Sequence, residues 1–352
     1  MSRSDRTHGD LDRHELLAHG VHDPREIIDL SVNVNPFGTH PEVLRAAREA
    51  MLDSYPDRDA REARAAIASE QRVDLRSVVV GHGANELLWA SIDAVAREAE
   101  GRPLLVVGPT FSEPEVAARA RGLAVKHVAL SAANDFAFEP SAVDASIREH
   151  APCAVYLCQP NNPTGRCFAS AELRALSEAH PGVQFLVDQS FLSLSTRHAE
   201  QHERFGERVV LIRSLTKDHA LAGLRAAYAL CHPDFAARLD GQRPLWTVSA
   251  PAQAAILAAL AHPEHVVRAR EALLATRAQL AAALATVGCH PVPSDTTFLL
   301  ARAPNADAVR SHLLQAHRIV VRSCRSFGLP DYLRFAAPTP SDLPRVIEAL
   351  RT

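Results

Sequence analysis

Residues 154–165 read AVYLCQPNNPTG, a short β-rich apolar run that ends in a polar turn. The same order recurs from residue 76 to 231, where such runs alternate with stretches that carry apolar residues at helical spacing. This alternation is typical of parallel βαβ units. We therefore predict an α/β fold with a doubly wound, mostly parallel seven-stranded sheet. The seven predicted strands are 78–80, 104–107, 125–130, 154–158, 185–187, 209–212 and 226–231.

The rest of the chain is arranged around this sheet. Residues 1–50 form a predicted N-terminal arm that joins a small domain, and residues 51–240 form the large domain. Residues 241–287 are Ala-rich and mostly helical, broken by Pro244 and Pro251, and connect to a small α/β domain at 288–352. The predicted strands of the small domain are 297–301, 319–322 and 332–336, and further helices are expected at 41–52, 306–317 and 341–351.

Composition excludes several classes of function. Lys and Arg total 38 against 41 Asp and Glu, so the net charge of -3 gives no overall bias toward nucleic acid or an anionic membrane. No apolar run is long enough for a membrane span or an export signal. The six cysteines form no CxxC pair, which disfavours disulfides and structural zinc and favours the cytoplasm. The 18 histidines are scattered without an HExxH motif, so we expect no metal.

Polar residues follow the predicted strands at four places, where ligands bind in open parallel sheets. After 78–80 comes GHGANE, whose glycines and helix-start amides suit a phosphate, although an ordinary strand-to-helix turn can carry glycine too. After 154–158 comes QPNNPTG, a turn with two adjacent amides that a plain turn does not need. Asp188 follows 185–187 and is a buried carboxylate that either caps a turn or pairs with a protonated ring nitrogen.

The fourth place is RSLTK, which ends at Lys217 and is followed by Gly223-Leu224-Arg225. A lysine after a strand is usually a solvated strand end. Here the hydroxyls of Ser214 and Thr216 and the guanidinium of Arg225 surround it, which suits a second set of phosphate ligands. Neighbouring positive charge also lowers the pKa of an amine, as attack on an aldehyde requires.

Taken together, these motifs resemble the fold-type I pyridoxal-phosphate superfamily of class I/II aminotransferases. The resembling motifs are NNPTG at 161–165, Asp188, SLTK at 214–217 and GLR at 223–225. Within it, the chain is similar to the histidinol-phosphate aminotransferase branch, and most of all to threonine-phosphate decarboxylase of cobalamin synthesis. The early His8-Gly9 and the run Arg322-Ser323-Cys324 favour the decarboxylase.

The resemblance implies pyridoxal 5′-phosphate as the cofactor, held as a Schiff base on Lys217 in the large, cofactor-binding domain, with Asp188 on the pyridine nitrogen. Tyr55 would reach the phosphate from a neighbouring subunit, which implies a homodimer with shared sites. The substrate would be a small molecule, namely an amino acid or a phospho-amino acid. The other implied cofactor-binding residues are Ala84, Asn85, Ser214 and Arg225 for the phosphate, Phe111 on the ring and Asn162 on its phenolic oxygen. The implied substrate-binding residues are Arg334, Arg322, His8 and Asn33.

Some residues depart from the family pattern. Gln189 follows Asp188, Phe191 lacks the hydroxyl of many aminotransferases, and Ala222 replaces a proline. Asp218 follows Lys217, and we expect its carboxylate to raise the pKa of the lysine and to alter the substrate pocket. The exact substrate is therefore left open, and a role in specialised metabolism is a further possibility.

The reaction depends on which bond at the substrate α-carbon stands perpendicular to the cofactor ring. The decarboxylase is our preferred prediction, and an aminotransferase of the histidinol-phosphate type is the alternative. A non-catalytic regulatory module of aminotransferase-like fold is a third reading. It would need a DNA-binding segment, and no helix-turn-helix pattern precedes residue 78.

Overall fold

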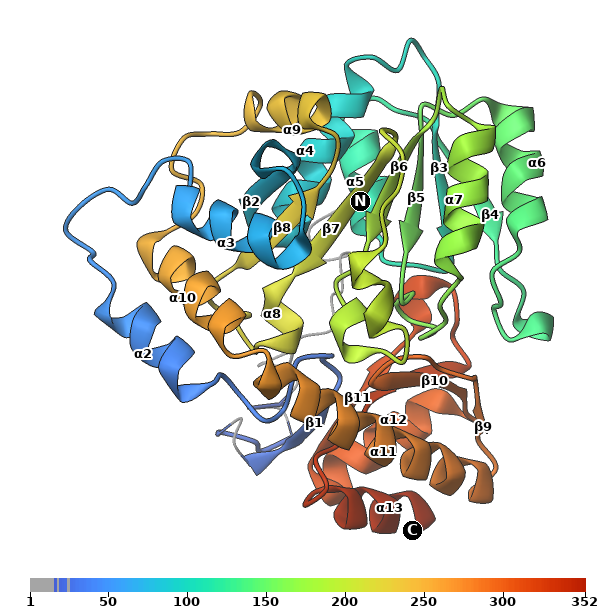
Figure 1. Ribbon diagram of the computed structural model, residues 1–352. Helices are drawn as coiled ribbons and strands as arrows, with labels where there is room; N and C mark the ends of the chain where they lie inside the picture. The colour runs from blue at the N-terminus through green and yellow to red at the C-terminus, as the bar shows by residue number, and fades with distance from the viewer. Residues whose placement is uncertain (1–15, 18, 24–25) are drawn as a thin grey trace.

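A seven-stranded sheet forms the centre of the computed structural model, which describes residues 16, 17, 19–23 and 26–352 (Figure 1). Strand β8 is antiparallel to both of its neighbours, and the remaining pairs are parallel. All seven predicted strands are present, so the predicted sheet is confirmed. In spatial order, the strands are β2 (Val78–His82), β8 (Ala226–Leu230), β7 (Val209–Ser214), β6 (Gln184–Asp188), β5 (Ala154–Cys158), β3 (Leu104–Gly108) and β4 (Val125–Ala129).

Both faces of this sheet are covered, which explains why its central strands are mostly apolar, whereas the edge strand β4 carries the exposed Lys126 and His127. Along β5, Val155 and Leu157 belong to one apolar cluster, whereas Tyr156 and Cys158 belong to another. Successive side chains of a strand point to opposite faces, so the two clusters are the two sides of the sheet. The helices on the Val155 side are α3 (Arg61–Gln71), α6 (Pro140–His150), α7 (Ser170–Ala179) and α10 (Ala250–Ala261), and those on the other side are α4 (Ala84–Ala96), α5 (Glu113–Ala120) and α9 (Pro233–Asp240).

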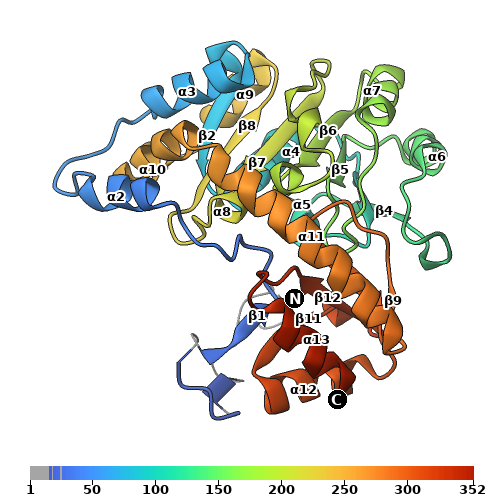
Figure 2. The same cartoon turned by 60° about the horizontal axis from the view of Figure 1, so that its bottom comes forward.

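A second, five-stranded sheet lies below the first in Figure 1, and Figure 2 shows its helices from another side. The N-terminal arm joins it, because β1 pairs in parallel with β11. The other pairs are antiparallel. Its strands are β1 (Ile28–Leu30), β11 (Ile319–Ser323), β12 (Tyr332–Ala336), β10 (Phe298–Arg302) and β9 (His290–Pro291), and its helices are α11 (Glu264–Thr286), α12 (Ala306–His317) and α13 (Leu343–Arg351). The domain boundaries given above stay a prediction.

The helical connection differs from the prediction in one respect. Pro251 does not break a helix but lies in the first turn of α10, where the Ser249 side chain accepts a hydrogen bond from the Ala252 amide. A proline is tolerated there because first-turn amides have no partner within the helix. The break falls instead at Pro263, between α10 and α11. Helix α10 packs against α3 and against α2 (Pro41–Glu49) of the arm.

Among the residues that the structure describes, no helix combines the length and the apolar character that crossing a lipid bilayer would demand.

Candidate active site

A cavity of about 660 Å³ lies at the carboxyl edge of the large sheet, and residues of the small domain also line it. Almost all of the predicted site residues line it, although they come from segments far apart in the sequence. The predicted residues that line the cavity are Asn33, Ala84, Asn85, Phe111, Asn162, Asp188, Ser214, Lys217, Arg225, Arg322 and Arg334.

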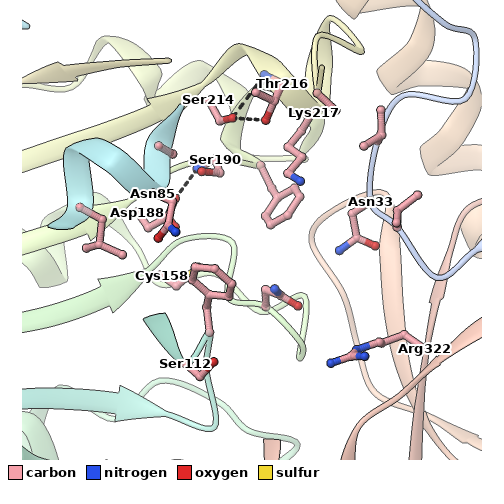
Figure 3. Close-up of a pocket in the computed structure, with 18 of the residues that line it drawn as sticks. Asn33, Asn85, Ser112, Cys158, Asp188, Ser190, Ser214, Thr216, Lys217 and Arg322 are labelled. Carbon is pink, nitrogen blue, oxygen red and sulfur yellow. Dashed lines mark hydrogen bonds between the residues drawn. The ribbon is translucent and has the colours of Figure 1, made fainter. Parts of the chain in front are cut away.

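Lys217 enters the cavity from the short helix α8 (Leu215–Asp218), directly after β7. Ser214 starts this helix, since its hydroxyl accepts a hydrogen bond from the Thr216 amide at 3.2 Å. Figure 3 shows the lysine amine pointing into the open space. Burial, and then the positive charges of Arg334 and Arg225, lower the pKa of Lys217. The site therefore favours a neutral amine, which is the form that attacks a carbonyl or accepts a proton.

Asp188 ends strand β6 and is buried, with 8% of its surface exposed. Its carboxylate accepts hydrogen bonds from the Ser190 amide at 2.9 Å and from the Tyr156 hydroxyl at 3.4 Å. Burial raises the pKa of Asp188. A buried carboxylate of this kind is stabilised by a cationic or protonated partner, and a protonated ring nitrogen in the cavity would supply one.

The anion cradle is formed by the start of α4 and by the side chains around it. Gly83 precedes α4 with a φ of 86°, and a Cβ at this position would overlap the guanidinium of Arg225. Glycine thus allows the first amides of α4, at Ala84 and Asn85, to lie close to that cation. The hydroxyls of Ser214 and Thr216, which are hydrogen-bonded to each other, line the same cavity. Amides, hydroxyls and a guanidinium are the donors that a phosphate group requires.

The small domain contributes two arginines to the opposite wall. Arg334, on β12, donates to the Asn162 side-chain oxygen at 2.5 Å and to the Ser31 carbonyl oxygen. Burial lowers its pKa to about 10, so the guanidinium still carries its charge at neutral pH. Arg322, on β11, donates to the Ser326 hydroxyl at 2.8 Å. This wall is therefore strongly cationic.

Asn33 lies between the lysine and Arg322 in Figure 3, on the arm segment that follows β1. Within the described part of the chain, neither its amide oxygen nor its amide nitrogen has a hydrogen-bond partner, and both atoms are buried. Buried amides are normally paired. A ligand in the cavity would satisfy them.

The expectation that Asp218 raises the pKa of Lys217 is wrong. Its carboxylate accepts hydrogen bonds from the Ser193 hydroxyl at 2.7 Å and from the His219 amide at 2.9 Å, and it lines a separate cavity of about 120 Å³. Gln189 lines that second cavity too, and its side-chain oxygen accepts a hydrogen bond from Arg213 at 3.0 Å. The carboxylate that acts on the lysine is Asp188.

Of the other two predicted site residues, Tyr55 does not line the cavity. Tyr55 has 82% of its surface exposed and packs against Trp246, with ring centres 4.8 Å apart. Its predicted role belongs to a neighbouring subunit and stays a prediction. His8 lies outside the described residues. The cavity also contains residues that the motifs did not indicate, among them Ser112, Cys158, Ser190, Ser326 and Phe327. The only feature of the sequence that could have indicated any of them is position along the chain, since Ser190 and Ser326 come shortly after predicted strands.

Comparison with known proteins identifies the family. The model of the family "Aminotransferase class I and II" matches residues 25–350. Histidinol-phosphate aminotransferase of Symbiobacterium thermophilum is 32% identical, over 94% of this chain and 91% of the relative. The enzyme of that name from Thermobifida fusca is 33% identical, over 92% of this chain and 89% of the relative.

Solved structures show the same architecture. L-threonine-O-3-phosphate decarboxylase from Porphyromonas gingivalis superimposes with a TM-score of 0.81 at 26% identity, covering 92% of this chain and 98% of the other. Histidinol-phosphate aminotransferase from Sinorhizobium meliloti, in complex with pyridoxal-5′-phosphate, gives a TM-score of 0.85 at 21% identity, covering 100% and 97%. The predicted fold type is thereby confirmed.

The cavity suits pyridoxal 5′-phosphate, which presents a phosphate, a ring nitrogen and an aldehyde. The amides of α4, Ser214 and Arg225 would hold the phosphate, Asp188 would pair with the ring nitrogen and Lys217 would bind the aldehyde carbon. The family match, the relatives and this donor set agree. The chain belongs to the class I and II aminotransferase family, in its histidinol-phosphate branch, and its cofactor is pyridoxal 5′-phosphate.

Proposed function

We propose that this enzyme is an aminotransferase of the histidinol-phosphate type, which moves an amino group between an amine that bears a phosphate and a 2-oxo acid. The observation that carries the proposal is the pair of arginines, Arg322 and Arg334, that lines the same cavity as Lys217. Two guanidiniums with an unpaired amide at Asn33 suit a phosphate or carboxylate group on the substrate. The curated relatives at 32% and 33% identity carry this name, which favours transamination over the decarboxylation that the motifs had suggested first.

The residues of the site can each take one part of such a reaction. The cofactor supplies an electron sink when it is bound. Asp188 would keep its ring nitrogen protonated, and Lys217, whose pKa is lowered, would take a proton from the substrate α-carbon and return it as a general base and acid. Arg334 would hold the anionic end of the substrate, and its hydrogen bond to Asn162 fixes the guanidinium in place.

Decarboxylation of a phospho-amino acid is the second candidate. Phe191 lines the cavity without a hydroxyl, and the decarboxylase from Porphyromonas gingivalis is similar over nearly its whole length. If Arg322 and Arg334 bind a side-chain phosphate, the substrate carboxylate is free to stand perpendicular to the ring and to leave as carbon dioxide. The orientation of the substrate thus decides between the two reactions.

Product analysis separates the two candidates. The holoenzyme is incubated with histidinol phosphate plus 2-oxoglutarate, and in parallel with phosphothreonine. Formation of glutamate supports the aminotransferase, whereas release of carbon dioxide from phosphothreonine with no glutamate in the first reaction would overturn it. The Lys217→Ala variant is the control for both assays, because it keeps the arginine wall but lacks the amine.

We further propose that the enzyme works as a homodimer in which Tyr55 completes the cavity of its partner. Tyr55 and Trp246 form an exposed aromatic pair, and Met51, Leu52 and Leu245 near them in sequence are exposed apolar side chains. Solvent-exposed apolar residues that gather in one region are typical of a surface that another protein covers.

A further inference from the structure

Three potential metal ligands meet outside the active site, where helix α2 begins and helix α10 ends. The nearest ligand atoms of His40, His262 and Glu264 all lie within 4.8 Å of one another. The rings of His40 and His262 are stacked with centres 4.2 Å apart, and Nδ1 of His262 lies 3.2 Å from Oε1 of Glu264. The sequence did not indicate this cluster, because His40 is far from His262 and Glu264 along the chain.

We propose that His40, His262 and Glu264 form a binding site for a divalent transition-metal ion such as zinc. Imidazole and carboxylate are ligands that zinc prefers, at about 2.0–2.2 Å from the ion, which places neighbouring tetrahedral ligand atoms about 3.3 Å apart. The His262 and Glu264 atoms already have this spacing. His40 completes a three-ligand set, and solvent would supply the fourth position.

Metal binding requires a small rearrangement that the surroundings allow. A metal ion lies in the plane of each imidazole that binds it, so the two rings must turn out of their stack, which has an interplanar angle of 21°. The side chain of His262 is 32% exposed and that of Glu264 is 50% exposed, so both can turn toward solvent. For His40, Nδ1 accepts a weak hydrogen bond of 3.3 Å from the Glu42 amide, which would be the bond lost if the ring turns.

A bound ion would link the N-terminal arm, through His40, to helices α10 and α11, through His262 and Glu264. Next to the cluster, Nε2 of His265 lies 2.9 Å from the Gly38 carbonyl oxygen, and the Asn35 backbone amide donates to the Lys217 carbonyl oxygen at 2.8 Å. The segment from Asn33 to His40 is therefore held near both of its ends, and Asn33 reaches the active-site cavity. An ion bound at the cluster would hold the His40 end of this segment, which lies away from the cavity. Its role would be structural, and it would take no part in the chemistry.

Without a metal, the same geometry would be a stacked histidine pair with one hydrogen bond to a glutamate. A metal site and a plain histidine pair predict different effects of zinc on binding heat and melting temperature. In the test, tag-free holoenzyme is treated with chelator and titrated with zinc by calorimetry, and the melting temperature is followed at each zinc concentration. We expect one saturable ion per chain and a melting temperature that rises with zinc, because the ion binds only the folded chain.

Variants locate the site. His262→Ala and Glu264→Gln should each weaken zinc binding by about 10- to 100-fold or more, since even the loss of residues that only support metal ligands has effects of this size. His312→Ala is the matched control, because His312 also packs against a second histidine, His317, with ring centres 5.1 Å apart. Binding that is absent, or that is unchanged in His262→Ala, would overturn the proposal.

A measurement on the unaltered protein covers the case in which a variant does not fold. Cobalt(II) bound to nitrogen and oxygen ligands absorbs visible light, and zinc should abolish the signal by competition. Zinc should also protect His40 and His262, but not His312, from modification by diethylpyrocarbonate. Equal modification of these histidines with and without zinc would count against the site.

Discussion

The guanidinium of Arg334 donates to the side-chain oxygen of Asn162 at 2.5 Å and thereby joins the small domain to the turn that follows β5 of the large sheet. The same guanidinium donates to the Ser31 carbonyl oxygen on the arm. One buried side chain thus links three segments around the cavity. Asn162 is also predicted to contact the cofactor. The hydrogen bond between Arg334 and Asn162 therefore couples the predicted substrate-binding arginine to the cofactor site.

Replacing Arg334 by lysine should affect both stability and substrate binding. A lysine keeps the charge but cannot bond Asn162 and Ser31 together, so the free energy of unfolding should fall by about 1–3 kcal/mol. The KM for the anionic substrate should rise. Arg322→Lys is the comparison, since Arg322 is only half-buried and its variant should raise KM with little loss of stability. Urea denaturation and steady-state kinetics measure the two effects, and equal stability of both variants would contradict this account.

Gly83→Ala should weaken cofactor binding, in addition to the loss of stability that backbone strain causes. A residue other than glycine at the φ of 86° and ψ of 155° of Gly83 costs about 1–3 kcal/mol, and the new methyl would also displace Arg225 from the anion cradle. Gly101→Ala provides the control, because Gly101 has a similar φ of 82° and its added methyl would contact nothing within 4 Å. Both variants should melt earlier, but only Gly83→Ala should need more pyridoxal phosphate for half saturation, as followed by absorbance.

Asp188→Asn should stabilise the cofactor-free chain at neutral pH and weaken the holoenzyme. Burial raises the pKa of Asp188 above 3.8, so the folded chain holds this proton more tightly than the unfolded chain does. The free energy of unfolding then falls as pH rises from about 3.8 through the folded pKa, by about 1.4 kcal/mol for each unit between the two pKa values. Asparagine lacks this dependence. Denaturation of both cofactor-free proteins at several pH values tests it, and parallel pH curves would refute it.

Mixing two inactive variants tests whether Tyr55 serves the neighbouring site. In a heterodimer of Lys217→Ala and Tyr55→Ala subunits, one site contains both defects and the other contains none. After subunit exchange at equal amounts, activity should return to about one quarter of wild type, because half of the dimers carry one intact site of two. If Tyr55 acts within its own chain, mixing restores nothing. Size-exclusion chromatography with light scattering checks the dimer itself.

The sequence predicted the large sheet well because most of its strands are buried on both faces and form clear apolar runs, as at 154–158. It predicted the site well because the polar residues that follow such strands meet at one edge. Lys217 and Asp188 reach the same cavity for this reason.

The failures concern the direction of side chains. Asp218 is adjacent to Lys217 in sequence, but successive residues of a helical turn point about 100° apart, and its carboxylate faces Ser193 instead. The histidine cluster was missed for a related reason. Whether His40 and His262 meet depends on how α2 packs against α10, and spacing along the chain carries no such information.

The reversed direction of β8 has a consequence for how the phosphate cradle tolerates change. Because this strand runs against its neighbours, Arg225 lies just before the strand begins and still reaches the edge where other strands finish. A slide of β8 by two residues along β2 and β7 would leave every apolar side chain on its own face, yet it would carry the guanidinium about 7 Å away from Gly83. The register of β8 against β2 and β7 therefore keeps the Arg225 guanidinium within reach of a phosphate. The hydrophobic pattern alone does not determine this register.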